Sequence, residues 1–243
     1  MTIKFYEEDI KQLILEKKHV FIKDKNTQSA VLFEKGLDVN SVIADCLIFT
    51  SDGNIIGVEI KTERDSTKRL NKQLKSYSKV CDYVYVLCED RHVDKVEDIL
   101  HNYNHAGVGI IAYTEFKGEP ILGVYQVATK SPTKSVVTAY MSLFWREELL
   151  NIAGSFKRQV STLEEKGLSV AKADSRGAVG MNGLLVQSSV SKRMKKPQIA
   201  KTIVDRLGEH KANHLLCNIY INKKLHPEKS LQYHHFKGDE QYR

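Results

Sequence analysis

Cysteine is scarce in this sequence, with four residues in a chain of 243. A count this low excludes the disulfide framework of a small secreted domain and predicts reduced, buried thiols. No apolar run approaches the roughly 20 residues that a membrane-spanning helix needs, and the amino terminus lacks the pattern of a signal peptide. We therefore expect a cytoplasmic protein with no membrane partner.

Acidic residues are few in the second half of the chain. Residues 131–243 contain 19 Lys and Arg against 10 Asp and Glu, a balance of +9, whereas residues 1–130 contain 18 against 20, a balance of −2. This distribution favours binding of a polyanion by the carboxy-terminal half. The densest basic part runs from 192 to 224, and its candidate nucleic-acid-binding residues are Lys192, Arg193, Lys195 and Lys196.

Two apolar, β-branched segments, residues 42–50 and residues 54–62, are predicted to form a hairpin. The sequence Ser51-Asp52-Gly53 between them is a turn signal. A loop of two residues and a loop of three residues are the alternatives. We predict the three-residue loop, with Gly53 in the left-handed conformation.

The length of this loop decides where the charged side chains lie. The three-residue loop places Asp45 opposite Glu59, whereas a two-residue loop would place it opposite Ile60, on the other face. Because side chains alternate along a strand, Lys61 lies on the same face as Glu59. The predicted hairpin therefore gathers two carboxylates and one ammonium group.

Neighbouring carboxylates repel each other, and burying them requires a cation or a raised pKa. Mg²⁺ or Mn²⁺ prefers oxygen ligands and would offset the repulsion between Asp45 and Glu59. Lys61 beside the metal would orient or deprotonate an attacking water and stabilise charge on a phosphate. The alternative is a solvated hairpin on which charged residues simply alternate outward.

Residues 64–79 are predicted to form a helix. Leu70, Leu74 and Tyr77 form an apolar stripe at three- and four-residue spacing, and Gln73 lies on the same side as Tyr77. Another face is basic and suits the phosphates of a nucleic acid. Its candidate nucleic-acid-binding residues are Lys68, Arg69, Lys72 and Lys75.

An Asp…Glu-x-Lys hairpin followed directly by a Gln-x-x-x-Tyr helix resembles the PD-(D/E)XK nuclease superfamily, particularly its exonuclease and RecB-like branches. The resemblance implies that Asp45 and Glu59 bind the metal and that Lys61 assists the water. It also implies that Gln73 and Tyr77 position the substrate strand and the site.

The same resemblance points to the first predicted helix, residues 3–17, because members often bring an acidic residue from it to the metal. Glu8, or else Glu7, is the candidate, although acids near a helix amino terminus are favourable in any case. Ala44 departs from the pattern, since it stands where proline often precedes the aspartate. The segment Leu-Phe-Trp-Arg-Glu-Glu-Leu around Trp145 is similar to uncharacterised bacterial and phage members.

The predicted elements alternate as helix, strands, helix, strand, helix and strand. Further strands are expected at residues 19–23, 30–33, 83–88, 108–113 and 118–127, the last at an edge because of Pro120, and a further helix at 93–103. This order predicts an α/β fold: a restriction-endonuclease-like core with a central mixed β-sheet flanked by helices, over residues 1–130. Residues 131–243 are expected to form a basic, mainly helical carboxy-terminal extension.

In the extension, helices are expected at residues 138–153 and 197–207. We expect Trp145, the only tryptophan, to pack the extension onto the core, with stacking on a nucleobase as the alternative. Residues 175–183 are glycine-rich but lack the features of a phosphate loop. Histidines at 210 and 214 with Cys217 lack the second close pair of ligands that structural zinc usually has.

The sequence thus predicts a nuclease that uses Mg²⁺ or Mn²⁺ to hydrolyse phosphodiester bonds, most readily in DNA, with the carbonyl of Ile60 joining Asp45 and Glu59 as a metal ligand. The alternatives are a non-catalytic nucleic-acid-binding or protein-interaction module on the same fold, and a nuclease subunit active only in a larger complex. The choice between DNA and RNA, a protein partner and a homo-oligomer all stay open.

Overall fold

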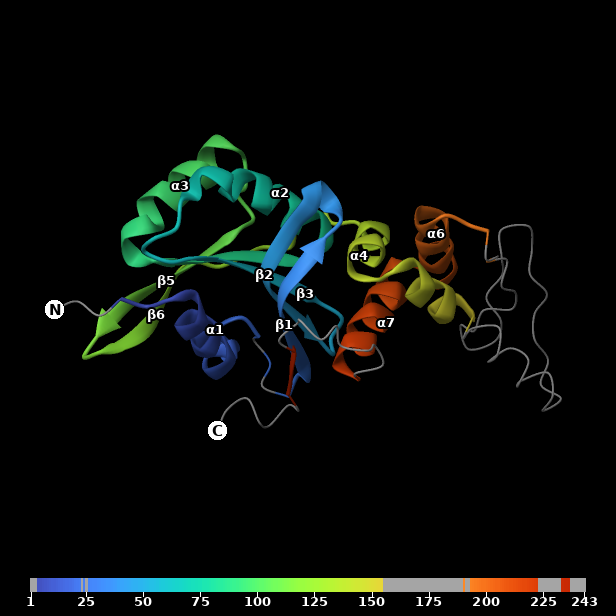
Figure 1. Ribbon diagram of the computed structural model, residues 1–243, viewed down its shortest axis with the longest axis horizontal. Coiled ribbons are helices and arrows are strands. Elements are labelled where there is room, and N and C mark those ends of the chain that lie inside the picture. The colour runs from blue at the N-terminus through green and yellow to red at the C-terminus, as the bar shows by residue number, and fades with distance from the viewer. Residues whose placement is uncertain are drawn as a thin grey trace.

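The computed structural model describes residues 4–222, except 23, 25, 155–189, 191 and 192, together with a strand at Tyr233–Phe236. Its centre is a seven-stranded sheet with strand order β6-β5-β4-β3-β2-β1-β7 (Figure 1). The bounds of the strands are β1 Ser29–Leu37, β2 Val42–Thr50, β3 Ile55–Lys61, β4 Tyr83–Glu89, β5 Gly109–Phe116, β6 Glu119–Gln126 and β7 Tyr233–Phe236.

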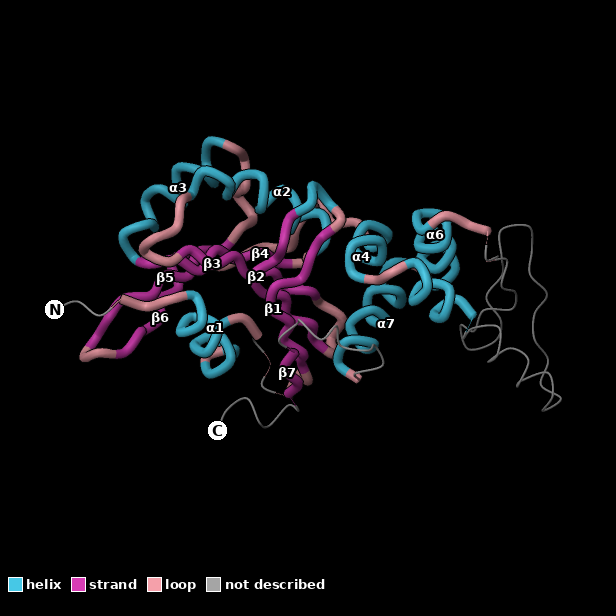
Figure 2. Tube along the Cα trace, in the orientation of Figure 1, coloured by secondary structure: helices cyan, strands magenta, loops and turns pink. Residues whose placement is uncertain are grey.

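The sheet is mixed, as the sequence predicts. β3 pairs with β4 and β4 with β5 in parallel, whereas the other neighbours are antiparallel. Helices supply the parallel connections and cover the sheet (Figure 2). The helices are α1 Glu7–Glu16, α2 Leu70–Val80, α3 Val93–Asn102, α4 Val136–Leu143, α6 Lys196–Leu207 and α7 Glu209–Ile221, and a further helix spans residues 146–154. The expected α/β fold with a helical carboxy-terminal part is confirmed.

Two hydrophobic clusters lie on the two faces of the sheet. One joins α1 to residues such as Phe33, Ile48 and Val58. The other joins the opposite face, including Leu47 and Phe49, to helices α2, α3, α4, α6 and α7. Burial of both faces explains why β3 has no exposed position.

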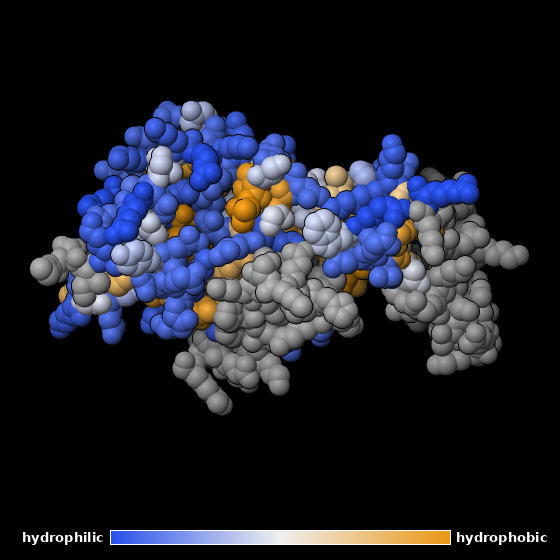
Figure 3. All heavy atoms as spheres, viewed as in Figure 1, coloured by the Kyte–Doolittle hydropathy of each residue, from blue (hydrophilic) through white to orange (hydrophobic). Residues whose placement is uncertain are grey.

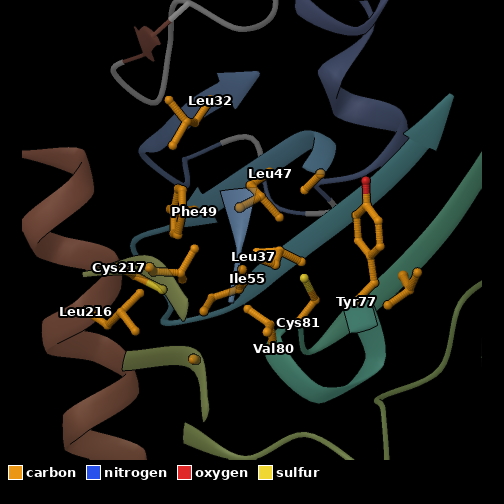
Figure 4. Close-up of a cluster of buried hydrophobic side chains, with 14 of the residues drawn as sticks. Leu32, Leu37, Leu47, Phe49, Ile55, Tyr77, Val80, Cys81, Leu216 and Cys217 are labelled. Atoms are coloured by element: carbon orange, nitrogen blue, oxygen red, sulfur yellow. The ribbon is translucent and has the colours of Figure 1, made fainter. Parts of the chain in front are cut away.

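The carboxy-terminal helices belong to the second of these clusters. Leu216 and Cys217 of α7 lie beside Phe49 and Ile55 (Figure 4). The ring of Phe49 stacks on Tyr220, with centroids 4.0 Å apart and an interplanar angle of 1°. The helical part therefore shares one apolar core with the sheet.

Several expected strands and helices agree closely with the structure. The strands of residues 83–88, 108–113 and 118–127 are present as β4, β5 and β6, and the helix of residues 93–103 is α3. β6 lies at an edge of the sheet, as Pro120 indicates. All four cysteines are free and buried, which confirms the prediction of reduced core thiols.

The strand predicted at residues 19–23 is wrong. The chain forms a 3₁₀ turn over Lys18–Val20, in which the N–H groups of Phe21 and Ile22 donate to the carbonyl of Lys18. Because those donors are used locally, they are not available to a sheet ladder. Phe21 and Ile22 instead pack in the cluster with α1.

Three helix predictions need correction at their boundaries. The helix predicted at residues 3–17 begins only at Glu7, because the backbone of Tyr6 is extended. The helix predicted at residues 64–79 begins only at Leu70, after a 3₁₀ turn over Thr67–Arg69. The helix predicted at residues 138–153 is broken at Phe144, whose backbone is extended, and the N–H of Trp145 donates to the Glu148 carboxylate at 2.5 Å. That contact satisfies a donor at the start of the next helix.

The expectation that Trp145 packs the extension onto the core is also wrong. The Trp145 side chain is 61% exposed, and the neighbouring Phe144 is 2% exposed and lies in the core. The extended backbone at the helix break turns successive side chains to opposite sides, so only one of the two aromatic residues can face inward. Residues 175–183, Lys192 and His226 lie outside the described residues.

Candidate metal and nucleic-acid site

The β2–β3 hairpin has the predicted three-residue loop. The N–H of Thr50 donates to the carbonyl of Asn54 at 3.0 Å, and Gly53 has a φ of 84°. Gly53 is needed for a second reason, because a Cβ atom there would lie 2.6 Å from the ring of His214. The loop prediction is confirmed.

The register of the hairpin brings Asp45 and Glu59 to opposite positions. The ladder pairs Cys46 with Val58, and the next step of the same register would pair Asp45 with Glu59. At this point the ladder ends and the Tyr77 hydroxyl takes part instead. It accepts the N–H of Asp45 at 2.8 Å and donates to the carbonyl of Val58 at 3.4 Å. Tyr77 therefore fixes the end of the paired region from helix α2.

The Asp45 carboxylate is partly buried and is held by backbone. It accepts the N–H of Ile60 at 2.8 Å. Across β1, the position facing Asp45 is Glu34, which lies between the pairs Phe33–Cys46 and Lys35–Ala44 and has a φ of 57°. A positive φ at a non-glycine residue marks a local irregularity, so both neighbours of β2 deviate from regular pairing beside Asp45.

The Glu59 carboxylate is fully buried and only half satisfied. Its Oε1 accepts from Lys61 Nζ at 2.5 Å, whereas its Oε2 has no hydrogen-bond partner among the described residues. Lys61 is itself buried, with 7% exposure. A buried carboxylate oxygen without a partner is costly, and such a group is a candidate ligand for a cation.

The electrostatics of the pair agree with this geometry. Burial, and then repulsion from Glu59, raise the pKa of Asp45 to about 8, although the Ile60 N–H and Lys61 act in the opposite direction. Burial also raises the pKa of Glu59, and Lys61, followed by the side chains of Tyr77 and Asp45, offsets part of that rise. Burial and the repulsion between the carboxylates both disfavour two ionised side chains here, and a bound cation would offset both effects.

Gln73 lies one helical turn before Tyr77 on α2. Its Oε1 is buried and has no hydrogen-bond partner among the residues that the structure describes. No hydrogen bond joins Gln73 to Asp45, Glu59 or Lys61 within that part of the chain. The structure therefore brings Asp45, Glu59, Lys61 and Tyr77 together, whereas no hydrogen bond among the described residues joins Gln73 to them.

Glu8, the metal ligand predicted on α1, contacts the ammonium group of Lys11. Lys11, which is 3% exposed, contacts Glu7 at 3.0 Å, Glu8 at 3.1 Å and Glu34 at 2.5 Å. Burial opposes the charge of Lys11, but its bonds to Glu34, Glu7 and Glu8 outweigh burial and raise its pKa. Two members of this group lie close to the site: Glu34 faces Asp45 across β1, and the charge of Glu7 contributes to the raised pKa of Asp45.

Lys11 is a residue that reasoning from the sequence missed. Its signal was present, because Glu7 and Glu8 precede it by four and three residues on α1 and therefore share its side of the helix. The contact of Glu34 with Lys11 depends on the irregularity in β1, which no sequence pattern predicts. Together these residues hold the buried Lys11 ammonium against Glu34, which faces Asp45 across β1.

The predicted basic residues fall in two groups. Lys68, Arg69, Lys72 and Lys75 are exposed on the 3₁₀ turn before α2 and on α2 itself. Arg193 and Lys195 are exposed before α6, whereas Lys196 is partly buried and contacts Asp38 at 2.5 Å. Figure 1 shows that α4 lies between α2 and α6.

Within the described part of the chain, no three His, Cys, Asp or Glu side chains lie close enough together to hold a metal ion. The two carboxylates of Asp45 and Glu59 still fit Mg²⁺, which keeps several waters and often uses only one or two protein carboxylates. The orphaned Oε2 of Glu59 and the raised pKa of Asp45 are the observations that support this fit. The rings of His210 and His214 lie 4.6 Å apart on α7, and the buried Cys217 thiol donates to the carbonyl of Asn54 at 3.5 Å.

Comparison with known proteins assigns a family. A family model described as bacteriophage P4 protein cII matches residues 1–222. The chain belongs to the bacteriophage P4 protein cII family. No curated protein matches the sequence.

One solved structure resembles the chain, a protein of unknown function, SPO1766, from Silicibacter pomeroyi. It has 11% sequence identity and a TM-score of 0.33, and the match covers 59% of this chain and 86% of that chain. A likeness at this level supports no argument about function. None of the described helices is both long and apolar enough to cross a membrane. The chemistry of this cII family member must therefore be argued from its own residues.

Proposed function

We propose that this member of the cII family is a metal-dependent nuclease that hydrolyses phosphodiester bonds, most readily in DNA. The observation that carries the proposal is the cluster of Asp45, Glu59 and Lys61 where β2 and β3 cease to pair. One oxygen of Glu59 is buried there without a partner. Two carboxylates and an ammonium group in a buried position fit a cation and a phosphate better than they fit a packed core.

Each residue has a role that its contacts suggest. Asp45 and Glu59, with the carbonyl of Ile60, would hold Mg²⁺ or Mn²⁺, which would supply positive charge to the phosphate oxygens and acidify a bound water. Lys61 lies 2.5 Å from Glu59 and would orient or deprotonate the attacking water. Tyr77 holds the Asp45 backbone and acts as a positioning residue.

The order of the elements also supports the proposal. The chain runs from α1 through β1, β2 and β3 to α2 and β4, and the candidate residues lie on β2, β3 and α2. This is the order that the resemblance to PD-(D/E)XK nucleases implies. The exposed residues Lys68, Arg69, Lys72 and Lys75 would contact the phosphate backbone, so binding should weaken steeply as salt is raised.

One observation favours a second candidate function, a non-catalytic binding module on the same fold. Lys61 already neutralises one oxygen of Glu59, and a purely structural ion pair would make the same contact. A third candidate is a nuclease subunit that works only in a larger assembly. These alternatives differ from the first in what the isolated chain does with DNA and metal.

The test is cleavage of linear and circular DNA, single- and double-stranded, and of RNA, with Mg²⁺, Mn²⁺ or EDTA. We expect cleavage that EDTA abolishes and that Lys61→Ala reduces at least roughly 100-fold, because proton transfer by a positioned side chain typically contributes that much. Lys95→Ala, an exposed lysine on α3, is the matched control and should cut normally.

Binding without cleavage in every metal would favour the binding module. Cleavage that appears only with added phage or host extract would favour the subunit. Cleavage by Lys61→Ala at the wild-type rate, in a preparation free of contaminating nuclease, would overturn the assignment of the site.

A further inference from the structure

A pocket of about 430 Å³ opens at the start of β2. Its walls come from the end of β1, the start of β2, the break after α4 and the beginning of α6. The volume lies within the roughly 300–1,000 Å³ range of small-molecule sites. Its lining combines exposed apolar side chains with cations and a hydroxyl, as in Ile43, Trp145, Lys35, Lys196 and Ser142.

The apolar wall of the pocket is unusually open to solvent. The side chains of Ile43 and Trp145 are 62% and 61% exposed. Trp145 faces outward because the backbone at Phe144 is extended and directs the phenyl ring into the core. Figure 3 shows exposed hydrophobic atoms near β2 and α2 within a largely hydrophilic surface. An exposed indole at a pocket is a surface on which a planar ring can stack.

Ser142 adds an independent observation. Its side chain is 5% exposed and lines the pocket, and its Oγ has no hydrogen-bond partner among the described residues. Buried hydroxyl groups normally have a partner, so this one is available to a polar atom of a ligand.

Side chains of both charges line the pocket. Lys35 and Lys196 line it, but Asp38 also lines it and pairs with Lys196 at 2.5 Å. The Lys196 ammonium lies 5.9 Å from the centre of the Trp145 ring. Because Lys196 is paired with Asp38 beside the Trp145 ring, the pocket suits a planar ring better than a run of phosphates.

The pocket adjoins the proposed catalytic centre along one strand. Ile43 is exposed and lines the pocket, and Asp45 is partly exposed two residues further along β2. Two residues of a strand span roughly 7 Å, which is a short step along a nucleic-acid strand. A strand whose phosphate lies at Asp45 would therefore pass the pocket with a neighbouring nucleotide.

We infer that this pocket binds one unpaired base of a single-stranded nucleic acid, stacked on Trp145, with the Ser142 hydroxyl bonded to a polar atom of the base. A base inside a duplex cannot enter, because its faces are covered by its neighbours. The inference rests on the proposed nuclease function and names its substrate class as single strands or frayed ends.

Trp145 is the only tryptophan, so its fluorescence reports on the pocket directly. The full chain is titrated in EDTA with an oligodeoxythymidylate of about eight nucleotides, within the usual site size of single-strand binders. We expect saturable quenching with the single strand and none with a duplex of the same length. Lys95→Ala, the exposed lysine on α3, should quench equally, and because EDTA removes the metal the readout does not depend on cleavage.

Two variants test the contacts through the anisotropy of a labelled oligonucleotide. Trp145→Ala should weaken binding roughly 5- to 100-fold, the usual effect of losing one stacked base. Tyr125→Ala removes an equally exposed aromatic side chain from β6 and should bind like the wild type. Ser142→Ala should weaken binding without lowering the stability of the free protein, because its hydroxyl has no bond to lose.

Binding of the single strand without quenching, together with normal affinity of Trp145→Ala, would overturn the inference. So would fluorescence that depends on protein concentration alone, which would show that a second copy covers the pocket. Cleavage of DNA without quenching would reject the pocket and leave the nuclease proposal intact. Quenching without cleavage in any metal would support the pocket and count against the nuclease.

Discussion

Two buried carboxylates, Glu59 in β3 and Asp82 just before β4, differ in how many hydrogen bonds they accept. Asp82 Oδ2 accepts the N–H of Ile55 at 2.8 Å and the amide of Asn213 at 3.1 Å, and it also contacts the Lys134 ammonium. Glu59 has the Lys61 ammonium on Oε1, and its Oε2 accepts no hydrogen bond from the described residues.

The two networks also differ in what they join. Asp82 connects the start of β3 to residue 134 in the chain after the sheet and to α7, so it links segments far apart in the sequence. Asn213 extends the link by donating to the carbonyl of Gly53 at 2.6 Å. Glu59 and Lys61 lie two residues apart on one strand, so their contact adds nothing to the fold beyond that strand. The satisfied carboxylate fits a structural role, and the half-satisfied one fits a ligand.

The largest expected effect on stability is at Asp82. Asp82→Asn leaves the Lys134 ammonium, which is buried, without an anionic partner, and breaking such a pair typically costs about 3–5 kcal/mol. Urea unfolding measures this loss. Asp98→Asn, an exposed change on α3, is the control and should change the free energy of unfolding by less than about 0.5 kcal/mol. An equally small effect for Asp82→Asn would show that its network does not stabilise the fold.

A smaller, pH-dependent effect on stability is expected at Asp45. Its pKa is raised to about 8 in the folded protein, so the folded state holds this proton more tightly than the unfolded state does. The resulting stabilisation is complete at low pH and is lost as the pH rises toward 8. Asp45→Asn mimics the protonated form and removes this dependence. The variant should therefore gain stability over the wild type by at most about 1.4 kcal/mol per pH unit between pH 5 and pH 8.

Unfolding in EDTA at several pH values measures this difference. A difference between the two proteins that does not change with pH would show that Asp45 is ionised throughout, and would remove the electrostatic argument for a cation. Added Mg²⁺ should stabilise the wild type most at the upper end of the range, because metal binding needs the ionised carboxylates.

The smallest effect on stability is expected at Tyr77. Tyr77→Phe leaves the Asp45 N–H without its acceptor, which should cost about 1–3 kcal/mol and also slow cleavage. Tyr140→Phe is the matched control, because its buried hydroxyl donates to the carbonyl of Ala212 away from the site. Urea unfolding and cleavage rates should show a similar loss of stability in both variants, but a loss of activity only at Tyr77. Equal activity of the two variants would remove Tyr77 from the site.

Local sequence patterns predict much of this fold. The alternation of apolar residues predicts β4, β5 and β6, and Ser51-Asp52-Gly53 predicts the loop that sets Asp45 opposite Glu59. The predictions that fail do so because other contacts compete with the predicted ones. A 3₁₀ turn uses the N–H donors of Val20, Phe21 and Ile22. The helix predicted at residues 138–153 breaks at Phe144, and the Glu148 side chain caps the helix that follows.

The site was predictable where it depends on neighbouring strands and on helical spacing. Asp45, Glu59, Lys61 and Tyr77 come together for those reasons. The buried Lys11, its contact with Glu34 and the Asp82 network depend on segments far apart in the chain, which no local pattern reveals. The exposure of Trp145 is likewise a consequence of a helix break rather than of its own residue type.

The central claim is that Asp45 and Glu59 form a metal site, and calorimetry of Mn²⁺ and Mg²⁺ binding to the full chain tests it most directly. We predict binding by the wild type with release of protons near pH 7, because the raised pKa of Asp45 keeps it protonated until metal binds. Asp45→Asn and Glu59→Gln should abolish this binding, and Asp98→Asn should retain it. Binding that persists in both site variants, or no binding by the wild type at millimolar metal, would contradict the account.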